Sequence, residues 1–414
     1  MAPYILLTIF VLITAFTYWL RYINLAWLKK YGSVVPVGFE DALNPEILEK
    51  TSAYTFESSR VSLYSSLFDN FLTIIFLFTG LFPLYDRFIA GLTNSFIISG
   101  ILFFIIIVMV QTLLELPFSL YSTFVVEAKY GFNTMTFRLW VVDFLKSQVI
   151  NYILLGLIIS VVFWLITWSP SKWWVLVWAF MALFGLFMMF ISPYIIEPLF
   201  NKFEPVTEEG LSDKIRAMME KAGLKLGKVV QMDASKRSKH SNAYFTGIGK
   251  VKRIVLYDTL IKQMTHEEIV AVLAHEIGHW KKKHILKRII MVEIFMFLGA
   301  WIVFQAVQWN GLPALLGMVT ASFPARLLII GFVASLVMFP ITPLSAWLSR
   351  RDEKEADQFA VDIVGSPDSL ASALIKLSSE NLSNLHPHPF YAKFYYSHPP
   401  VVQRVNRLKS MSPE

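Results

Sequence analysis

Long apolar runs dominate this chain, and shorter polar segments separate them. A helix of about 20 mostly apolar residues is long enough to cross the hydrocarbon core of a bilayer. Seven runs reach about this length, at residues 3–20, 68–90, 95–118, 147–168, 174–198, 286–309 and 327–348. The first run has no Lys or Arg before Arg21 and no clear small-residue cleavage site, so we interpret it as a retained span and not as a signal peptide.

Two stretches, about 199–285 and 349–414, are too polar to be spans. In the first stretch, residues 207–224 have helical periodicity, and Gly223, near their end, has the position of a C-cap. Runs rich in β-branched and aromatic residues then predict strands at 228–233, 241–250 and 252–258. The middle run, "SNAYFTGIGK", ends in a Gly-containing turn, which favours a hairpin. We therefore predict a small unit of helices and strands.

A further helix is predicted over "THEEIVAVLAHEIGHWKKKH" (265–284). Thr265 followed by Glu268 forms the pattern of a capping box, which marks a helix N-terminus. The apolar positions that follow have helical spacing, namely Ile269, Val270, Leu273, Ile277 and Trp280. The pentapeptide HEIGH (275–279) therefore lies on a helix that directly precedes the sixth span.

Composition supports a polytopic membrane protein. The chain is 55% hydrophobic and 16% charged, whereas a soluble domain carries about 25% charged residues. The sequence has 0 cysteines, which excludes disulfides, thiolate metal ligands and a cysteine nucleophile. The net charge of +7 is better explained by basic loops held on one side of a membrane than by nucleic acid, so we expect no nucleic-acid partner.

The distribution of Lys and Arg predicts the orientation in the bilayer. With seven spans and the N-terminus outside, the outer loops contain only Arg87, Lys172 and Arg326. The other 34 of the 37 basic residues then face the cytoplasm or lie at that boundary. The positive-inside rule therefore places both polar stretches in the cytoplasm.

HEIGH has the spacing of a metal site. Positions i and i+4 share a face of a helix, so His275 and His279 can direct imidazole nitrogens at one zinc ion. Glu276 lies beside the first ligand and can serve as general base toward a zinc-activated water. Gly278 places no side chain next to the metal, which leaves room for a substrate backbone. The alternatives are a chance match and a structural pair of histidines.

A catalytic zinc needs a third protein ligand and one open position. The second polar stretch contains "SRRDEKEADQFA" (349–360), in which Glu353 and Asp357 share a helix face. Glu353 could supply the third ligand oxygen, and Asp357 could accept an N–H from a ligating histidine. Spacing alone leaves open whether both are solvated helix charges. Glu355, on a different face, is a competing candidate.

The other six histidines lie outside HEIGH and have separate interpretations. His398 precedes two prolines in "YYSHPPVVQRVNRL" (395–408), which fix it in an extended turn. His398 or Arg404 could donate to an oxyanion, although a surface residue is the alternative for a lone histidine in a turn. The other five are expected in loops or exposed to solvent: His240, His266, His284, His386 and His388.

Taken in order, these motifs resemble those of the integral-membrane zinc CAAX prenyl proteases of type I, which cleave after a prenylated cysteine. The resemblance runs through nearly the whole chain. It rests on HEIGH and on seven further segments, "TFESSR" (55–60), "VVEAKYGFN" (125–133), "PLFNKF" (198–203), "SKRSKHSNAYFTG" (235–247), "KRIVLYDTL" (252–260), "EKEAD" (353–357) and "YSHPP" (396–400).

The resemblance implies roles for individual residues. It makes His275, His279 and Glu353 the ligands of one zinc ion per chain and Glu276 the general base, and it demotes Glu355. It also implies that His398 and Arg404 lie beside the scissile carbonyl. Asn242 and Ala243 match the edge strand that pairs with the backbone of a peptide substrate, and that substrate is prenylated in the family.

The fold that the resemblance implies is mostly α-helical. Seven transmembrane helices form a ring around a water-filled chamber, and an α+β zinc metalloprotease domain caps its cytoplasmic end. The predicted organisation is 1–198 with five spans and cytoplasmic loops at 21–67 and 119–146, 199–285 with the zinc metalloprotease region and the HExxH helix, 286–348 with two spans, and 349–414 as a C-terminal cytoplasmic segment that completes the active site. We expect a monomer in the lipid bilayer.

The chain is shorter than eukaryotic members and shows no obvious retrieval signal after "KSMSPE". This favours a bacterial inner membrane over the alternative, the endoplasmic reticulum. Three functions compete: a zinc endopeptidase acting on prenylated CAAX-type or other membrane-associated substrates, a quality-control protease that needs no prenyl group, and a non-catalytic chamber or channel protein. The charges that flank HEIGH argue against a protease that cuts within transmembrane segments.

Overall fold

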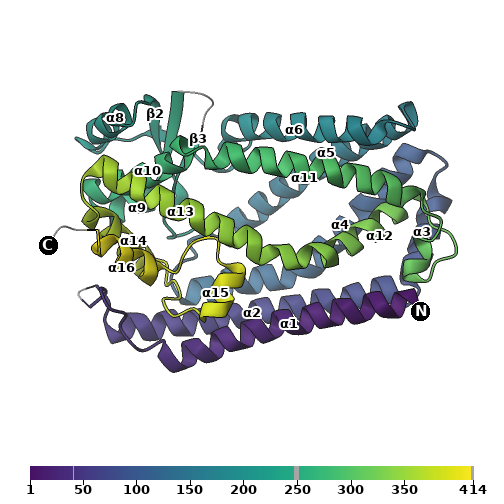
Figure 1. Cartoon of the computed structure of the whole chain (residues 1–414), viewed down its shortest axis with the longest axis horizontal. Helices are drawn as coiled ribbons and strands as arrows, with labels where there is room; N and C mark the ends of the chain where they lie inside the picture. The colour runs from purple at the N-terminus through teal and green to yellow at the C-terminus, as the bar shows by residue number, and fades with distance from the viewer. Residues whose placement is uncertain (41, 247–250, 412–414) are drawn as a thin grey trace.

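The computed structural model describes residues 1–40, 42–246 and 251–411. Within these ranges, seven helical stretches are long and apolar enough to cross a membrane, as predicted. They are α1 (Ala2–Tyr31), α2 (Pro45–Phe78), α4 with the π-helical turn η1 (Phe96–Glu127), α5 (Phe137–Trp168), α6 with α7 (Trp173–Phe200), α11 (His284–Gln308), and α12 to α13 (Phe323–Val364). They run along the long axis of the molecule, and the sheet lies at the end opposite the N-terminus (Figure 1).

The second predicted span, 68–90, is wrong at both boundaries. α2 begins at Pro45 and ends at Phe78, and a separate helix, α3 (Leu81–Leu92), follows it. Gly80 lies between them with φ +90°, a left-handed conformation that an L side chain rarely adopts. The helix therefore breaks inside an apolar run, where hydropathy gives no sign of an interruption.

The segments 21–67 and 119–146 are mostly helical and not loops, which corrects that part of the prediction. α1 continues to Tyr31 and α2 starts at Pro45, so only 32–44 separates them. In the other segment, η1 (Ser122–Glu127) prolongs α4 and α5 starts at Phe137. A helix satisfies its own backbone hydrogen bonds. It can therefore continue beyond the apolar run, where hydropathy no longer registers it.

The polar stretches hold a four-stranded mixed sheet of order β1-β2-β4-β3. Its strands are β1 (Phe203–Pro205), β2 (Lys225–Met232), β3 (Ala243–Thr246) and β4 (Val251–Tyr257). β3 pairs with β4 in antiparallel fashion, as the predicted hairpin requires, whereas its turn at 247–250 lies outside the described residues. β2 pairs with β4 in parallel. β1, which pairs with β2 in antiparallel fashion, was not predicted from the sequence. β3 is an edge strand of this order.

Six helices of the described residues complete the unit that carries HEIGH. They are α8 (Leu211–Lys221), α9 (Asp258–Gln263), α10 (His266–Lys281), α14 (Asp368–Glu380), α15 (Pro389–Tyr395) and α16 (Val401–Lys409). Three of them, α8, α9 and α10, pack on the sheet. Short 3₁₀ turns complete the chain at η2 (Ala234–Lys236), η3 (Pro313–Leu316) and η4 (Phe339–Ile341). Gly223 ends α8 with φ +67°, as its position predicted.

One apolar core joins this unit to the segment between α1 and α2. Its fully buried members come from distant parts of the chain and include Phe39, Leu48, Ile215, Leu273, Ile277 and Leu408. The core packs α10 against α8, α13 and α14. Burial of this apolar surface holds α10 and α13 together, and these two helices carry the candidate metal site.

Candidate metal centre

α10 begins where the sequence predicted. Oγ1 of Thr265 accepts a hydrogen bond from the backbone N–H of Glu268 at 3.3 Å, and Glu268 Oε2 accepts from the Thr265 N–H at 2.8 Å. This is the reciprocal pattern of a capping box. Lys376 of α14 also lies 2.8 Å from Glu268 Oε2. The first turn of α10 is therefore held to α14, and the register of the helix that bears HEIGH is secured.

His275, His279 and Glu353 converge on one point. Nε2 of His275 lies 3.3 Å from Nε2 of His279. The carboxylate of Glu353, from α13, approaches both rings, with Oε2 3.3 Å from His275 Nε2 and Oε1 3.2 Å from His279 Nε2. Metal bonds of about 2.05 Å in a tetrahedron would separate the ligand atoms by about 3.3–3.4 Å. The three side chains thus have the spacing of a metal site.

The surroundings of the cluster also fit a cation. Glu353 is 3% exposed and His275 is 6% exposed. Glu353 Oε2 is buried without a hydrogen bond of acceptable geometry, although several nitrogens lie near it. Burying a carboxylate oxygen without a hydrogen bond costs free energy, unless the oxygen is paired with a positive charge or coordinates a metal. The cluster therefore favours a bound metal ion.

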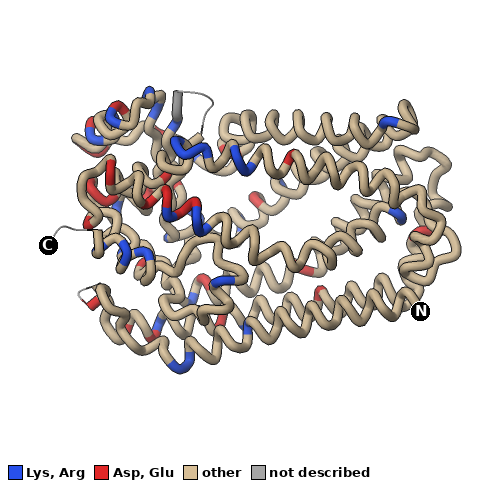
Figure 2. Tube along the Cα trace, viewed as in Figure 1, with Lys and Arg blue, Asp and Glu red and all other residues tan. Residues whose placement is uncertain are grey.

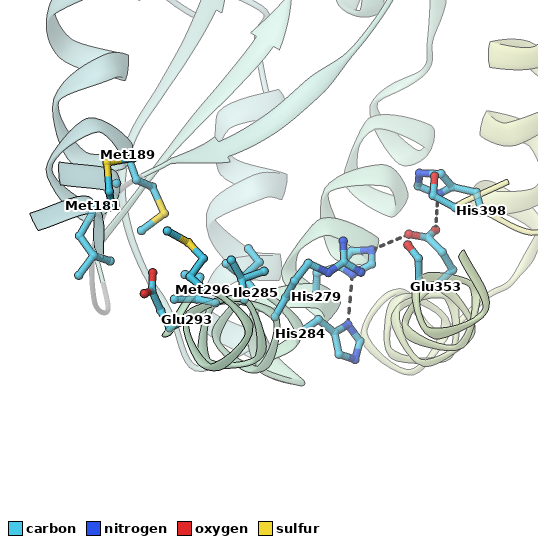
Figure 3. A pocket seen from close by; sticks show the side chains of 16 residues that line it. Met181, Met189, His279, His284, Ile285, Glu293, Met296, Glu353 and His398 are labelled. Carbon is cyan, nitrogen blue, oxygen red and sulfur yellow. Dashed lines mark hydrogen bonds and ion pairs between the residues drawn. The ribbon is translucent and has the colours of Figure 1, made fainter. Parts of the chain in front are cut away.

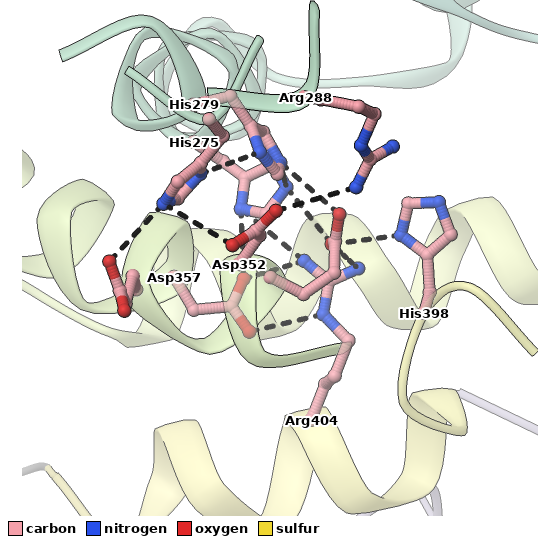
Figure 4. Close-up of polar contacts among 10 residues, drawn as sticks. His275, His279, Arg288, Asp352, Asp357, His398 and Arg404 are labelled. Atoms are coloured by element: carbon pink, nitrogen blue, oxygen red, sulfur yellow. Dashed lines mark hydrogen bonds and ion pairs between the residues drawn. The ribbon is translucent and has the colours of Figure 1, made fainter. Parts of the chain in front are cut away.

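Asp357 and Arg404 lie behind His275 (Figure 4). Asp357 Oδ1 is 2.9 Å from Nδ1 of His275, the relation that the sequence predicted for a partner of a ligand. Arg404 donates to Asp357 through Nε at 3.1 Å and through Nη2 at 2.5 Å. The guanidinium is 8% exposed, and its Nη1 is 3.6 Å from Glu353 Oε2. Arg404 thus holds Asp357 in place, and its contact with the scissile carbonyl stays a prediction.

His398 contacts the cluster, and Glu276 is the residue next to His275 on α10. Nδ1 of His398 is 2.8 Å from Glu353 Oε2, and its side chain is 60% exposed. It lies in the turn between α15 and α16, as the two prolines predicted. Glu276 follows His275 on α10 and is half-buried. Burial lowers the pKa of Arg404, but Asp357, then Glu353 and then Glu276 raise it, and the result is a pKa above the usual value.

Asn242 and Ala243 lie at the start of the edge strand β3. Asn242 O accepts a hydrogen bond from Tyr257 N–H at 3.1 Å, and Asn242 Oδ1 accepts from Ala243 N–H at 2.8 Å. Ala243 pairs with Leu256 of β4. β3 also packs beside α10, the helix that carries His275 and His279.

Gly278 does not face open space, contrary to the expectation that it leaves room for a substrate. A Cβ at this position would meet Ala356 of α13, at 2.9 Å from its Cα and 3.0 Å from its carbonyl oxygen. The glycine therefore lets two helix backbones cross closely. The close crossing brings Glu353, three residues before Ala356, within reach of both histidines.

Replacing Gly278 by alanine is expected to push α10 and α13 apart. We expect a loss of stability of about 1–3 kcal/mol, typical of overpacking, and weaker metal binding because Glu353 moves with α13. Thermal unfolding in detergent and metal content measure both effects. Gly299→Ala is the control, since its Cβ would meet nothing within 4 Å. Equal behaviour of the two variants would contradict the close crossing.

His275 is predicted to make metal binding depend on pH. Burial lowers the pKa of His275, but hydrogen bonds to Asp357 and Glu353 outweigh it and raise the pKa from 6.5 to about 9 in the metal-free protein. A ligating imidazole must be unprotonated, so binding releases this proton. Metal affinity should therefore rise about tenfold per pH unit from about 6.5 to 9. Chelator competition across this range measures the slope, and an affinity independent of pH would contradict the prediction.

The same pKa shift predicts how the stability of the metal-free protein depends on pH. This dependence has the opposite direction to that of metal affinity. Because the folded-state pKa lies above the unfolded value, the stabilisation is complete below about pH 6.5 and is lost as pH rises through about 9. Unfolding in the presence of a chelator measures it.

Two histidines that we expected to be solvated are not. His284 is 3% exposed and contacts His279. His240 is half-buried, stacks on Phe132 and lies 2.9 Å from Asn381 Oδ1. Neither lies at helical spacing from a recognised motif. Only the folded chain reveals their partners.

A cavity of about 600 Å³ opens beside the cluster. His279, Glu353 and His398 line its polar end, and its other walls are largely apolar. Met181 and Met189 of α6 and Met296 of α11 contribute to these walls (Figure 3). The cavity therefore connects the metal site with an apolar space between two membrane helices.

Seven apolar helices joined to a small sheet with a buried His–His–Glu cluster define a membrane-embedded metallopeptidase. Residues 24–202 match the family described as CAAX prenyl protease N-terminal, five membrane helices, and residues 205–412 match Peptidase family M48. CAAX prenyl protease 1 of Saccharomyces cerevisiae is 33% identical, over 91% of this chain and 89% of its own length. The chain belongs to the CAAX prenyl protease 1 family of M48 metallopeptidases.

Further similarities extend over nearly the whole chain. The CAAX prenyl protease 1 homolog of Homo sapiens is 31% identical, over 93% of this chain and 90% of its own length. The crystal structure of S. mikatae Ste24p superposes with a TM-score of 0.91 at 29% identity and covers 99% of each chain. The protein is thus a multi-pass membrane peptidase of mostly α-helical fold, as predicted.

Proposed function

We propose that this protein is a zinc endopeptidase that cleaves prenylated CAAX-type substrates at the membrane. The observation that carries the proposal is the tetrahedral spacing of His275, His279 and Glu353 at the end of an apolar cavity. Two imidazoles and one carboxylate with a fourth position left open are typical of catalytic zinc. We expect one zinc ion per chain, to be measured by elemental analysis of the purified protein.

The side chains around the cluster suit peptide hydrolysis. A bound zinc ion would supply Lewis-acid activation of water and of the scissile carbonyl. Glu276 would accept the proton of the attacking water. His398, exposed and adjacent to Glu353, would donate to the oxygen on which negative charge develops. Arg404 would act through Asp357, whose carboxylate holds the Nδ1 proton of His275.

The edge of β3 supports an extended substrate. An edge strand offers backbone N–H and C=O groups to which a peptide can add as a further strand. We propose that Asn242 and Ala243 contribute to this pairing. Main-chain hydrogen bonds impose little sequence preference, so the selection of substrates must come from other contacts.

The apolar cavity supports a lipidated substrate. Its largely apolar walls reach from His279 between α6 and α11, and they include Met181 and Met296. Methionine side chains are flexible and fill irregular apolar spaces. A prenyl chain attached near the scissile bond would bury apolar surface there while the peptide lies at the metal.

A pair of peptides of one sequence, with and without a farnesyl group, tests the substrate class. The purified protein is reconstituted in liposomes, and kcat/KM is measured for both. We expect the farnesylated peptide to be cleaved much faster. Equal rates would favour a quality-control protease without a prenyl requirement, and cleavage of neither peptide would contradict the proposed substrate class.

We propose that the active site faces the cytoplasm. Lys and Arg gather at the end of the molecule that carries the sheet (Figure 2), which by the positive-inside rule is the cytoplasmic end. Reporters fused after residue 93 or 171 should therefore lie outside the cytoplasm, and one fused after residue 208 should lie inside. The reverse pattern would contradict this orientation.

We further propose that the helices enclose water. Asp69 of α2, Glu115 of α4 and Glu293 of α11 lie within membrane-spanning helices. Ionisable residues at such depth are costly in lipid and generally face a protein interior or water.

We propose that the protein works as a monomer, because all three candidate ligands come from one chain. Light scattering of the detergent-solubilised protein measures this. The bacterial inner membrane, with the endoplasmic reticulum as the alternative, stays a prediction from the sequence.

A further inference from the structure

His284 contacts the metal cluster and lies at the junction of α10 and the membrane helix α11. Lys283 connects the two helices with φ 58°, a left-handed conformation uncommon for a residue with a side chain. This turn brings the His284 ring back toward His279 (Figure 3). His284 is 3% exposed, although it follows three consecutive lysines.

The contacts of His284 form a chain that starts at a metal ligand. Nδ1 of His284 is 3.1 Å from Nδ1 of His279. On its other side, Nε2 of His284 is 3.2 Å from Glu355 Oε2 and 3.8 Å from Asp352 Oδ1. Both carboxylates belong to α13, where they flank Glu353.

If His279 binds a metal, these contacts indicate which nitrogen carries the proton in the rings of His279 and His284. Nε2 of His279 faces His275 and Glu353, so it must be unprotonated to bind a metal. The single proton of the neutral His279 ring then lies on Nδ1, and it can be donated only to an acceptor. Nδ1 of His284 supplies that acceptor, which places the proton of His284 on Nε2, where it is donated to Glu355.

The two ligating histidines are therefore supported in different ways. His275 has a carboxylate partner, Asp357, at 2.9 Å from Nδ1. His279 meets the carboxylate of Glu355 only through an intervening imidazole. A carboxylate partner of a ligating histidine fixes its tautomer and ring orientation and raises its basicity.

We propose that His284, backed by Glu355, is a positioning residue that holds His279 in the metal-binding tautomer and orientation. The inference rests on the metal site proposed above. It also ties α11 to the metal, because the ring that supports His279 is the first residue of that membrane helix. The alternative is that His284 only packs the junction of α10, α11 and α13.

Three variants separate these possibilities. His284→Phe keeps a ring of similar shape but removes both nitrogens. His284→Asn keeps an acceptor near the position of Nδ1 but loses the link to Glu355. His240→Phe is the matched control, since His240 also contacts a carboxylate, at 3.3 Å from Glu127, but has no contact with the cluster.

Zinc affinity is measured for the full-length protein in detergent by competition with a chelator at fixed pH. We expect His284→Phe to bind zinc about 10–100-fold more weakly, as is typical when a partner of a ligand is lost, and His284→Asn to recover part of the loss. The absorption spectrum of the Co²⁺ form should shift in His284→Phe, because the ring of a ligand is no longer held. His240→Phe should match the wild type in both measurements.

Thermal unfolding of the metal-free variants completes the test. Wild-type affinity and spectrum in His284→Phe would overturn the proposal. So would equal losses in His284→Phe and His284→Asn accompanied by a lower unfolding temperature, because they would show a packing role. A wild-type protein that binds no zinc would instead overturn the metal site itself, together with everything built on it.

Discussion

Replacing Glu276 by glutamine is expected to abolish most of the peptidase activity while leaving the metal in place. The substitution keeps the shape of the side chain and removes the basic carboxylate. General base catalysis contributes about 10²–10⁴-fold to a rate, so kcat should fall by at least that order. Because Glu276 is not among the three clustered ligands, metal content and substrate binding should stay near the wild-type values.

The comparison that isolates this effect is His275→Ala, which should lose metal and activity together. Single-turnover cleavage and metal analysis of both variants separate the two behaviours. If Glu276→Gln cleaved its substrate at nearly the wild-type rate, the role of general base would belong to another residue, and HEIGH would serve metal binding alone.

Replacing Glu353 by alanine is expected to cost most of the metal affinity. Glu353 approaches both histidines within 3.3 Å and is the only carboxylate in the cluster found among the described residues. Its loss should weaken zinc binding by more than the about 10–100-fold typical for a partner behind a ligand. It also removes one of the negative partners of protonated His275, so the metal-free protein should unfold at lower temperature, most clearly below about pH 6.5, where the stabilisation by these partners is complete.

Glu355→Gln is the matched control on the same helix. Glu355 reaches the cluster only through His284, and a glutamine still offers an oxygen to that ring. Its loss of zinc affinity should be no larger than that of a partner behind a ligand, and so much smaller than the loss in Glu353→Ala. Equal losses in the two variants would mean that Glu353 is not the third ligand.

Local patterns predicted the parts of the site that depend on short stretches of chain. Thr265 and Glu268 begin α10, and i, i+4 spacing puts His275 and His279 on one face. These features need only the geometry of a single helix. The same holds for the apolar runs, which predicted seven spans from length and hydropathy, although their boundaries were less accurate.

Local patterns alone did not identify the third ligand. Helical spacing related Glu353 to Asp357, but it could not show that α13 packs against α10. Resemblance to the family selected Glu353 over Glu355. In the structure, Glu353 is buried against the histidines and Glu355 faces His284.

By itself, then, the amino-acid sequence determined that seven segments are long and apolar enough to cross a membrane, which helix carries the two histidines, and that these histidines have the spacing of a metal site. Only the tertiary structure decided that Gly278 serves a helix crossing, that Arg404 hydrogen-bonds Asp357, and that His284 contacts His279. The physical reason is that periodicity reports contacts within one helix. These three relations join residues on different helices. They arise when the shared apolar core brings α10, α13 and α16 together and the turn at Lys283 places the start of α11 beside them.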